Sequence, residues 1–248
     1  MSSPRPELRL DWCSYAAAKY AVERWHYSGT LPSQKLVKIG VWETGKFVGS
    51  VCFGDGANPG MFKPFGLDYT TGCELVRVAL AQHSTAVTRI VSVALRMLKQ
   101  ACPGIQLVLS FADPEYGHLG AIYQAGNWIY LGKTEPADEY IVRGVRMHGR
   151  ALRSTRSTHV LRDRPGQNVM EWARMVLDPK ITRVAGSSKY RYAMPLDPEM
   201  RARILPLAQP YPKRAGSIGA DAPVHQTGEG GSTPTPALTV QSPALQVP

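Results

Sequence analysis

Ser110-Phe111-Ala112-Asp113-Pro114 ends an apolar run that begins at Ile105 and follows Pro103-Gly104. A short apolar run between two turn signals predicts a strand that is buried on both faces of a sheet. In open α/β sheets, ligands bind beyond the carboxyl ends of the strands, and Asp113 stands at such an end. The stretch therefore predicts an active-site edge, with a helix over about His118 to Ala125 directly after it.

Outward from this strand, the sequence alternates between helical and extended patterns. Residues 14–25 have helical spacing behind Ser14 as N-cap, and a second helix starts at Val87 behind the capping candidates Ser84 and Thr85. The remaining periodic segments predict strands at 37–41, 47–53, 74–81, 128–132 and about 140–147. On the strand over 74–81, alternation groups Leu75, Arg77 and Ala79 on one face and Val76, Val78 and Leu80 on the other.

The resulting order is α, β, β, β, α, β, α, β, β, with a helix between two central strands that splay apart. This order is similar to the GCN5-related N-acetyltransferase fold, and it implies a mixed α/β class with a mixed central sheet flanked by helices. We expect this catalytic core at 1–147, a basic extension that packs on it at 148–205, and a tail at 206–248. The tail is rich in Pro, Gly, Ser and Thr, so burial cannot offset the entropy of ordering it.

The chain has 248 residues and a formal net charge of +10 at pH 7. Its basic residues concentrate between Arg143 and Arg191, where only Asp163, Glu171 and Asp178 oppose them. Such an excess favours a polyanionic partner, and nucleic acid ahead of a membrane surface. A basic surface that only maintains solubility is the alternative.

Four cysteines, Cys13, Cys52, Cys73 and Cys102, include no Cys-x-x-Cys pair. They predict reduced, mostly buried thiols rather than a disulfide framework or a structural zinc site. The sequence has no apolar window long enough to cross a membrane and no signal-peptide pattern at its start. We therefore expect a soluble intracellular protein.

The loop before the second helix reads Leu80-Ala81-Gln82-His83-Ser84-Thr85-Ala86 and contains no glycine. N-acetyltransferases carry a glycine-bearing loop here, whose backbone amides hold the pyrophosphate of coenzyme A. Because side chains keep a backbone away from a pyrophosphate, coenzyme A is not the expected donor. A smaller acyl donor or an anion at Ser84 and Thr85 stays open.

A second polar constellation, Trp25-His26-Tyr27-Ser28, follows the first predicted helix. His26 offers a titratable base and Tyr27 a phenol at a solvated helix-to-loop boundary. The alternative is an aromatic cap that covers the end of the helix. The local sequence does not decide between the two.

Taken in order along residues 8–205, these segments resemble the Mom DNA-modification proteins of Mu-like phages. The segments that carry the resemblance are Trp25-His26-Tyr27-Ser28, the strand with Arg77, Asp113, Gly117-His118-Leu119-Gly120, Tyr123 and Lys189-Tyr190-Arg191-Tyr192. The resemblance implies a phage or prophage transferase in the host cytoplasm. It would convert adenine in double-stranded DNA to N6-carbamoylmethyladenine and so protect that DNA from restriction.

The resemblance also implies the residues of the site. The catalytic residues it implies are His26, Tyr27, Arg77, Asp113 and Tyr123. An iron ion is suggested, for which His26, His118 and Asp113 would be ligands of suitable chemistry. The group donor is unknown, and we expect it to contact Ser84, Thr85 and His118. Double-stranded DNA is the expected partner, through Lys35, Arg150, Arg153 and Arg156, which are chosen on charge alone. No membrane partner is expected, and a homodimer is left open.

The proposed reaction assigns a role to each residue, beside a structural alternative. The adenine N6 amine is a poor nucleophile, so its attack needs proton removal and a positioned electrophile. Asp113 would accept that proton or orient the amine, unless it only forms the turn before Pro114. Arg77 would hold a carboxylate or stabilise an oxyanion, unless it pairs with Glu74 or Asp113.

The aromatic residues also have either a functional or a structural role. Tyr123 would donate a proton or stack on a base, unless its hydroxyl only bonds to backbone. Because N6 lies inside the duplex, the base must be turned out, and Tyr27, Tyr116 or Trp128 would stack on it. The sequence does not show which one does so.

Two other functions are compatible with the sequence. A conventional amine N-acetyltransferase would bind coenzyme A tightly, which the glycine-free loop disfavours. A non-catalytic DNA-binding protein would bind DNA in a salt-dependent manner and form no new nucleoside.

Overall fold

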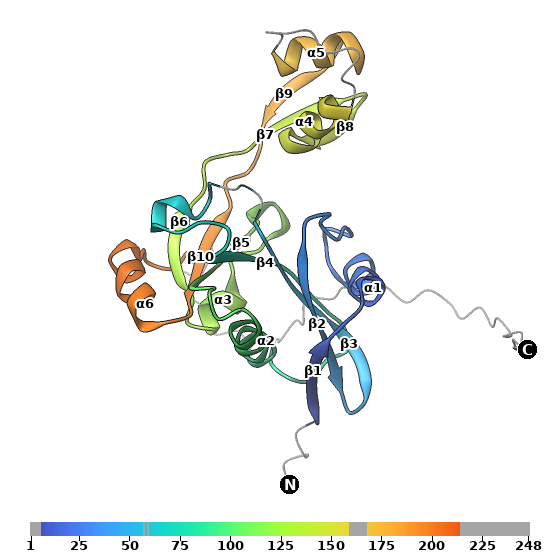
Figure 1. The fold of residues 1–248 in the computed structure, drawn as a ribbon. Helices are drawn as coiled ribbons and strands as arrows, with labels where there is room; N and C mark the ends of the chain where they lie inside the picture. The colour runs from blue at the N-terminus through green and yellow to red at the C-terminus, as the bar shows by residue number, and fades with distance from the viewer. Residues whose placement is uncertain (1–5, 57, 59, 159–167, 214–248) are drawn as a thin grey trace, which may run out of the picture. The chain divides into compact units, whose positions relative to one another are not determined.

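The computed structural model of the chain describes residues 6–213, apart from 57, 59 and 159–167. Within these residues, seven strands form one sheet in the order β1-β2-β3-β4-β5-β10-β6 (Figure 1). In that order they span Leu8–Trp12, Leu36–Glu43, Lys46–Gly54, Gly72–Leu80, Leu107–Ala112, Tyr190–Pro195 and Ile129–Lys133. Neighbouring strands pair antiparallel, except for the parallel pair β4 and β5, which the crossover helix α2 connects.

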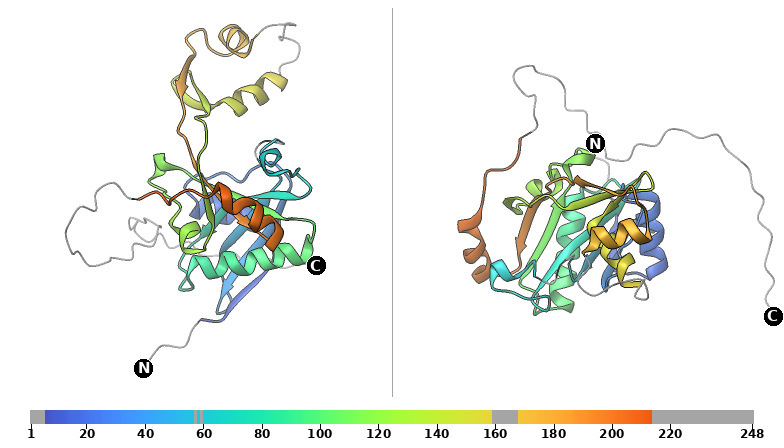
Figure 2. Two further views of the ribbon diagram at one scale, coloured as in Figure 1. Left: turned by 90° about the vertical axis from the view of Figure 1, so that its left-hand side faces the viewer. Right: turned by 90° about the horizontal axis from the view of Figure 1, so that it is seen from above.

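Helices cover both faces of this sheet (Figure 2). On one face, α1 (Tyr15–Trp25) packs on β3 and β4, and α6 (Pro198–Ile204) packs on β10. On the other face lie α2 (Val87–Ala101) and the short α3 (Ala121–Ala125). Single turns of 3-10 helix occur at η1 (Lys63–Phe65), η2 (Pro114–Tyr116) and η4 (Leu205–Leu207).

The two central strands separate at their carboxyl ends. β4 pairs with β5 only from Gly72 to Glu74, and beyond that point β5 pairs only with β10. Near the point of separation β4 has a bulge at Val76. Arg77 lies opposite Cys52 of β3 and Leu75 lies opposite Phe53, so Val76 has no residue opposite it. A bulge inserts one residue and bends its strand. The expected splay between the two central strands is therefore present.

Because of this bulge, the regular alternation expected for residues 74–81 is wrong. Leu75 packs in the same cluster as Val78 and Leu80, whereas Val76 packs with Ala79 on the face of α1. The extra residue reverses the alternation after Leu75, so Val76 and Arg77 do not take opposite faces as a regular strand would place them.

An insertion, residues 138–185, lies between β6 and β10 in the chain and has a sheet of its own. Its strands are β7 (Asp138–Val142), β8 (Val145–His148) and β9 (Thr182–Ala185), in the order β8-β7-β9. They pack with α4 (Gly149–Thr158) and α5 (Val169–Val176), and the insertion's own core contains Leu152 and Trp172. Backbone hydrogen bonds join Thr134 to Lys189 and Gly186 to Ala137, so the β6-β10 pair continues as a two-stranded ribbon into the insertion.

Most of the elements expected around β5 are confirmed. The Ser14 side chain caps α1 by accepting the amide of Ala17, and β2 and β3 form the expected hairpin. β5 is buried along nearly its whole length and ends directly before Asp113. The four cysteines are free thiols, with Cys52 and Cys73 buried.

Other expectations are wrong. Ser84 and Thr85 do not cap α2, whose N-cap is Ala86. The segment over 140–147 is a hairpin rather than one strand, because Arg143 and Gly144 adopt positive φ angles of 50° and 76° and form the turn. The core does not end at residue 147, since β10 is a central strand of the main sheet.

The predicted tail also needs a later start. Gln209 donates its amide to the Tyr130 carbonyl at 2.8 Å, and the Tyr211 hydroxyl donates to the Trp128 carbonyl at 2.7 Å. The rest of the tail, 214–248, lies outside the described residues. No helix of the described part is long and apolar enough to cross a membrane.

Two glycines in the loop after β5 provide a matched test of stability. Gly117 and Gly120 have φ angles of 73° and 80°, so alanine strains the backbone at either position. A Cβ at Gly117 meets nothing within 4 Å, but at Gly120 it would lie 2.3 Å from the buried Tyr192 ring. We expect Gly117→Ala to lower the free energy of unfolding by about 1 kcal/mol. Gly120→Ala should cost roughly 1–3 kcal/mol more, because Tyr192 must shift.

Urea unfolding of both variants, followed by circular dichroism, measures the difference. Equal losses of stability would mean that Tyr192 does not pack against Gly120 as described.

Candidate functional site

Four aromatic side chains meet where the loops after α1 and β5 approach each other. The Tyr27 ring stacks on His26 at 4.4 Å between centroids, and lies 4.5 Å from Tyr116 and 4.9 Å from His118. We call these four residues the aromatic cluster. The structure thus brings together three of the predicted site residues, His26, Tyr27 and His118, and adds Tyr116 from η2.

Arg77 extends from the bulge of β4 toward the same loops. Its Nε donates to the Thr30 carbonyl at 3.1 Å and its Nη1 donates to the Val76 carbonyl at 2.6 Å. Burial lowers the pKa of Arg77, and the charge of Arg77 contributes, after burial, to the lowered pKa of His26. Two backbone carbonyls therefore fix the guanidinium plane beside the aromatic cluster. Of its two alternative ion-pair partners, Asp113 pairs with Lys189 instead, whereas the charge of Glu74 acts on Arg77.

Tyr123 is buried beneath the separated strands. A 2.7 Å hydrogen bond joins its hydroxyl to that of Ser110, and the Ser110 hydroxyl also donates to the Leu75 carbonyl at 2.9 Å. Because Ser110 has a single proton, Tyr123 is the donor in their shared bond. Burial raises the pKa of Tyr123 to about 12. The hydroxyl therefore stays protonated and ties α3 to both central strands.

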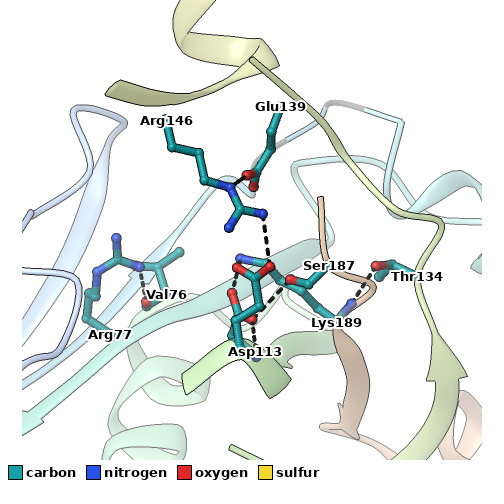
Figure 3. A network of polar contacts seen from close by, with 9 residues as sticks. Val76, Arg77, Asp113, Thr134, Glu139, Arg146, Ser187 and Lys189 are labelled. Atoms are coloured by element: carbon teal, nitrogen blue, oxygen red, sulfur yellow. Dashed lines mark hydrogen bonds and ion pairs between the residues drawn. The ribbon is translucent and has the colours of Figure 1, made fainter. Parts of the chain in front are cut away.

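Three donors hold Asp113, two from the stretch just before β10 and one from its own turn (Figure 3). Lys189 Nζ lies 3.1 Å from its Oδ2, while the Ser187 hydroxyl and the Glu115 amide each donate to its Oδ1 at 3.1 Å. Its backbone carbonyl accepts the amides of Tyr116 and His118. Asp113 therefore fixes both the start of β10 and the loop that carries half of the aromatic cluster.

Burial by itself would raise the pKa of Asp113. The hydrogen bonds and charge of Lys189, with the Glu115 amide and the Ser187 hydroxyl, outweigh burial and bring the pKa below its ordinary value. Asp113 is consequently an anion at neutral pH and a weak base.

His26 is a neutral imidazole in this setting. Burial, then the charges of Arg77 and His118, lower its pKa to about 4. The Ser28 amide donates to His26 Nδ1 at 3.1 Å, so Nδ1 is an acceptor and the proton of the neutral ring is on Nε2.

These contacts do not suit the metal site suggested by the sequence. Within the described ranges, no three His, Cys, Asp or Glu side chains lie close enough together to hold a metal ion. The Nε2 of His26 carries its proton, and the Asp113 carboxylate already accepts from three donors. The residues present therefore do not fit iron held by His26, His118 and Asp113.

The start of α2 is occupied by a carboxylate of the chain itself. Glu43, at the end of β2, accepts the Ser84 amide on Oε2 and the Thr85 amide on Oε1, both at 2.7 Å. Burial would raise the pKa of Glu43, but hydrogen bonds from Thr85 and Ser84 bring it below its ordinary value. Two of the three residues expected to contact the donor, Ser84 and Thr85, are thus engaged by an internal anion.

Arg146 of the insertion contacts the core site. Arg146 of β8 donates through Nε to Glu139 and through Nη2 to Glu115 at 2.9 Å (Figure 3). Glu115 belongs to η2, between Asp113 and Tyr116. This ion pair joins the insertion to the loop that carries Tyr116 and His118.

The expected DNA contacts occupy two places. Arg150 and Arg153 are exposed on α4, where Arg156 is partly buried, and Lys35 is exposed in the loop before β2. Burial, then the charge of Arg150, lower the pKa of His148 at the end of β8, while the charge of Glu139 opposes them. His148 therefore lies within electrostatic range of Arg150 on α4.

Several of these partners were not identified from the sequence. Glu43, Glu115, Arg146 and Ser187 have no local signature, because each acts on a residue at least thirty positions away or in another element. Lys189 belongs to a segment that carries the family resemblance, but its pairing with Asp113 needed the register of β10 against β5.

The strand order, the parallel pair that separates at a bulge and the crossover helix α2 define a protein with an N-acetyltransferase-like fold. A family model described as the Mom protein family matches residues 7–213. The chain belongs to the Mom protein family.

A relative and a solved structure complete the comparison. The methylcarbamoylase Mom of Escherichia phage Mu is 29% identical over 133 residues, which are 52% of this chain and 55% of the relative. The match thus spans about half the length of that relative. An aminoglycoside acetyltransferase, AAC(6')-Ib with coenzyme A, aligns with a TM-score of 0.40 and 12% identity over 60% of this chain and 99% of that structure.

The Asp113–Lys189 pair predicts a pH dependence of stability. Because the pKa of Asp113 is lowered in the folded protein, its contribution is complete above the ordinary aspartate pKa of about 4 and is lost as the pH falls through the lower, folded value. We expect Asp113→Asn to be less stable than the wild type at pH 7, with the difference decreasing toward pH 3.

Urea unfolding at pH 7, 5 and 3 measures this difference. Asp11→Asn is the matched control, since Asp11 forms an exposed pair with Arg9 on β1. A difference for Asp113→Asn that stays constant over this pH range would contradict the ionised pair.

Proposed function

We propose that the chain is a transferase that modifies the N6 amine of adenine in double-stranded DNA to N6-carbamoylmethyladenine. The observation that carries the proposal is the fixed guanidinium of Arg77 beside the aromatic cluster, at the separated ends of β4 and β5. Membership of the Mom family and the similarity to a methylcarbamoylase support the type of reaction. Protection of phage DNA from restriction in the host cytoplasm is the proposed biological role.

In this proposal Arg77 and Tyr27 bind the donor. A guanidinium with its Nε and Nη1 engaged by carbonyls presents its remaining N–H groups in a fixed plane, which suits a carboxylate or a developing oxyanion. Burial, followed by the charge of Asp113, raises the pKa of Tyr27, so its phenol keeps a proton to donate. N6 forms its new bond to the carbamoylmethyl carbon while the bond from that carbon to the leaving group of the donor breaks. The leaving group departs with that electron pair, which Arg77 and Tyr27 stabilise, and in the end takes up the proton that N6 loses.

Asp113 orients rather than deprotonates. Its lowered pKa makes it a weak base, but Oδ2 has one acceptor position beside the Lys189 contact. That position suits an N–H of the adenine amine. Tyr123 supports the site from below through Ser110, so its role is to hold α3 against the separated strands.

The donor in this proposal is not coenzyme A. A pyrophosphate at the start of α2 would compete with the Glu43 carboxylate for the amides of Ser84 and Thr85, and would meet its negative charge. A donor without a diphosphate avoids that conflict.

Double-stranded DNA is the proposed partner of the insertion. The exposed cations Arg150 and Arg153 are close in sequence on α4, and α4 follows the strand that carries Arg146. Phosphate contacts by such cations position a duplex without reading its sequence.

Mass spectrometry of nucleosides from plasmid DNA tests the reaction. DNA from cells that express the wild-type chain should contain a deoxyadenosine heavier by the carbamoylmethyl group. Arg77→Gln should lower its amount on the order of 100-fold, because a fixed oxyanion donor is lost. Arg89→Gln, on the exposed side of α2, is the matched control and should leave the yield unchanged.

Unmodified DNA from cells with ample soluble wild-type protein would contradict the proposal. Saturable binding of coenzyme A by that protein would then favour the conventional amine N-acetyltransferase. Full activity of Arg77→Gln would refute only the role of Arg77 and would leave the proposed reaction standing.

The salt dependence of DNA binding tests the basic surface of α4. Removing one phosphate contact should reduce the slope of log K against log salt by about 1. We expect this for Arg153→Gln, and a smaller change for Arg183→Gln, whose charge Asp138 already neutralises. Fluorescence anisotropy with a random-sequence duplex over a series of salt concentrations measures both slopes, and equal slopes for all three proteins would exclude Arg153 as a phosphate contact.

A further inference from the structure

Two rings of the aromatic cluster expose a large part of their surface to solvent. Tyr27 is 49% exposed and Tyr116 is 57% exposed, and neither packs in a hydrophobic core of the described residues. Their centroids lie 4.5 Å apart with 41° between the ring planes. The fold does not need these rings for its core, so their solvent-exposed sides are available to another molecule.

We propose that Tyr27 and Tyr116 form the surface on which one unpaired purine base, turned out of the DNA duplex, stacks during modification. This inference rests on the proposed function, because it names the part of the DNA substrate that occupies the site. A flat heteroaromatic base matches an exposed aromatic pair, since base-to-ring stacking does not depend on which base is present.

Both rings are held in place before a base arrives. Tyr27 stacks on the neutral His26 ring with 29° between their planes, which gives it a support on one side. Tyr116 ends η2, where the Asp113 carbonyl accepts its amide and Gly117 turns the chain with a φ of 73°. A preorganised aromatic surface loses little conformational freedom when a base stacks on it.

Ion pairs fix the loop that carries Tyr116. Lys189 pairs with Asp113, and Arg146 pairs with Glu115 next to Tyr116. Because each of these cations is already paired with a carboxylate, they hold the loop in place rather than attract a phosphate backbone. A base on the pair would thus meet a loop whose position is set before the base arrives.

The remaining stacking candidate from the sequence is excluded by burial. Trp128 is 1% exposed and its ring packs against Tyr123 in the core. It cannot receive a base without unfolding that part of the core. Tyr69 is 60% exposed but has no ring neighbour among the described residues, and it therefore serves as the control.

A duplex with an unpaired base separates stacking from the energy of base flipping. The probe carries 2-aminopurine opposite an abasic site, and the reference duplex carries an abasic site in place of the 2-aminopurine. The wild-type protein should bind the probe on the order of tenfold more tightly than the reference, and should quench the fluorescence of the base as it stacks. Both duplexes have the same phosphates, so basic contacts alone predict equal affinity.

Three variants assign the preference to the aromatic pair. Tyr116→Leu should abolish the preference and the quenching, whereas Tyr116→Phe should keep both, because it retains the ring. Tyr69→Leu should behave like the wild type. Unchanged far-ultraviolet circular dichroism of Tyr116→Leu confirms that its fold is intact.

The outcomes for the inference and for the proposed function are distinct. A wild-type protein that modifies plasmid DNA but binds both duplexes equally would overturn the stacking surface and leave the reaction standing. A clear preference without any modified nucleoside would support the surface and overturn the reaction. A preference that persists in Tyr116→Leu would place the base elsewhere.

Discussion

The site depends on the limited pairing between β4 and β5. Three residue pairs, from Gly72 to Glu74 on β4, hold the parallel strands together before the bulge at Val76 separates them. A fully paired sheet would leave no room for Arg77 between the loops after α1 and β5, and would place its side chain on the opposite face. Ser110 bridges the widening gap by bonding to both the Leu75 carbonyl and the Tyr123 hydroxyl. The opening is therefore a supported feature of the sheet.

Two internal anions determine the electrostatics on either side of this opening. Glu43 accepts the backbone amides of Ser84 and Thr85 in the loop directly before α2. Asp113 pairs with Lys189 and binds the amides of its own loop through its backbone carbonyl. Between them Arg77 is the charged group whose hydrogen bonds go to backbone carbonyls, and its charge helps to keep His26 neutral. In the proposed function, the Glu43 carboxylate takes the place at these two amides that the diphosphate of a donor would otherwise occupy.

The insertion extends the same hairpin that completes the main sheet. β6 and β10 pair in the core, and their ribbon continues through Thr134 and Lys189 into β7 and β9. The insertion has its own buried cluster, which contains Trp172. Arg146 and Lys189 nevertheless link it to η2 and Asp113. A contact between the insertion and a polyanion would therefore act next to the residues proposed for catalysis.

The sequence by itself determined the elements whose signals are local. The apolar periodicity of α2, the Ser14 cap of α1, the hairpin of β2 and β3 and the polar end of β5 at Asp113 all follow from residues within a few positions of one another. The resemblance of separated motifs added the family and the set His26, Tyr27, Arg77, Asp113 and Tyr123. Tertiary structure alone decided the bulge at Val76, the return of β10 into the sheet, the Glu43 contact across 41 residues and the Lys189 pair of Asp113. The physical reason is that backbone periodicity depends on neighbours along the chain, whereas strand register and buried ion pairs depend on which distant segments pack together.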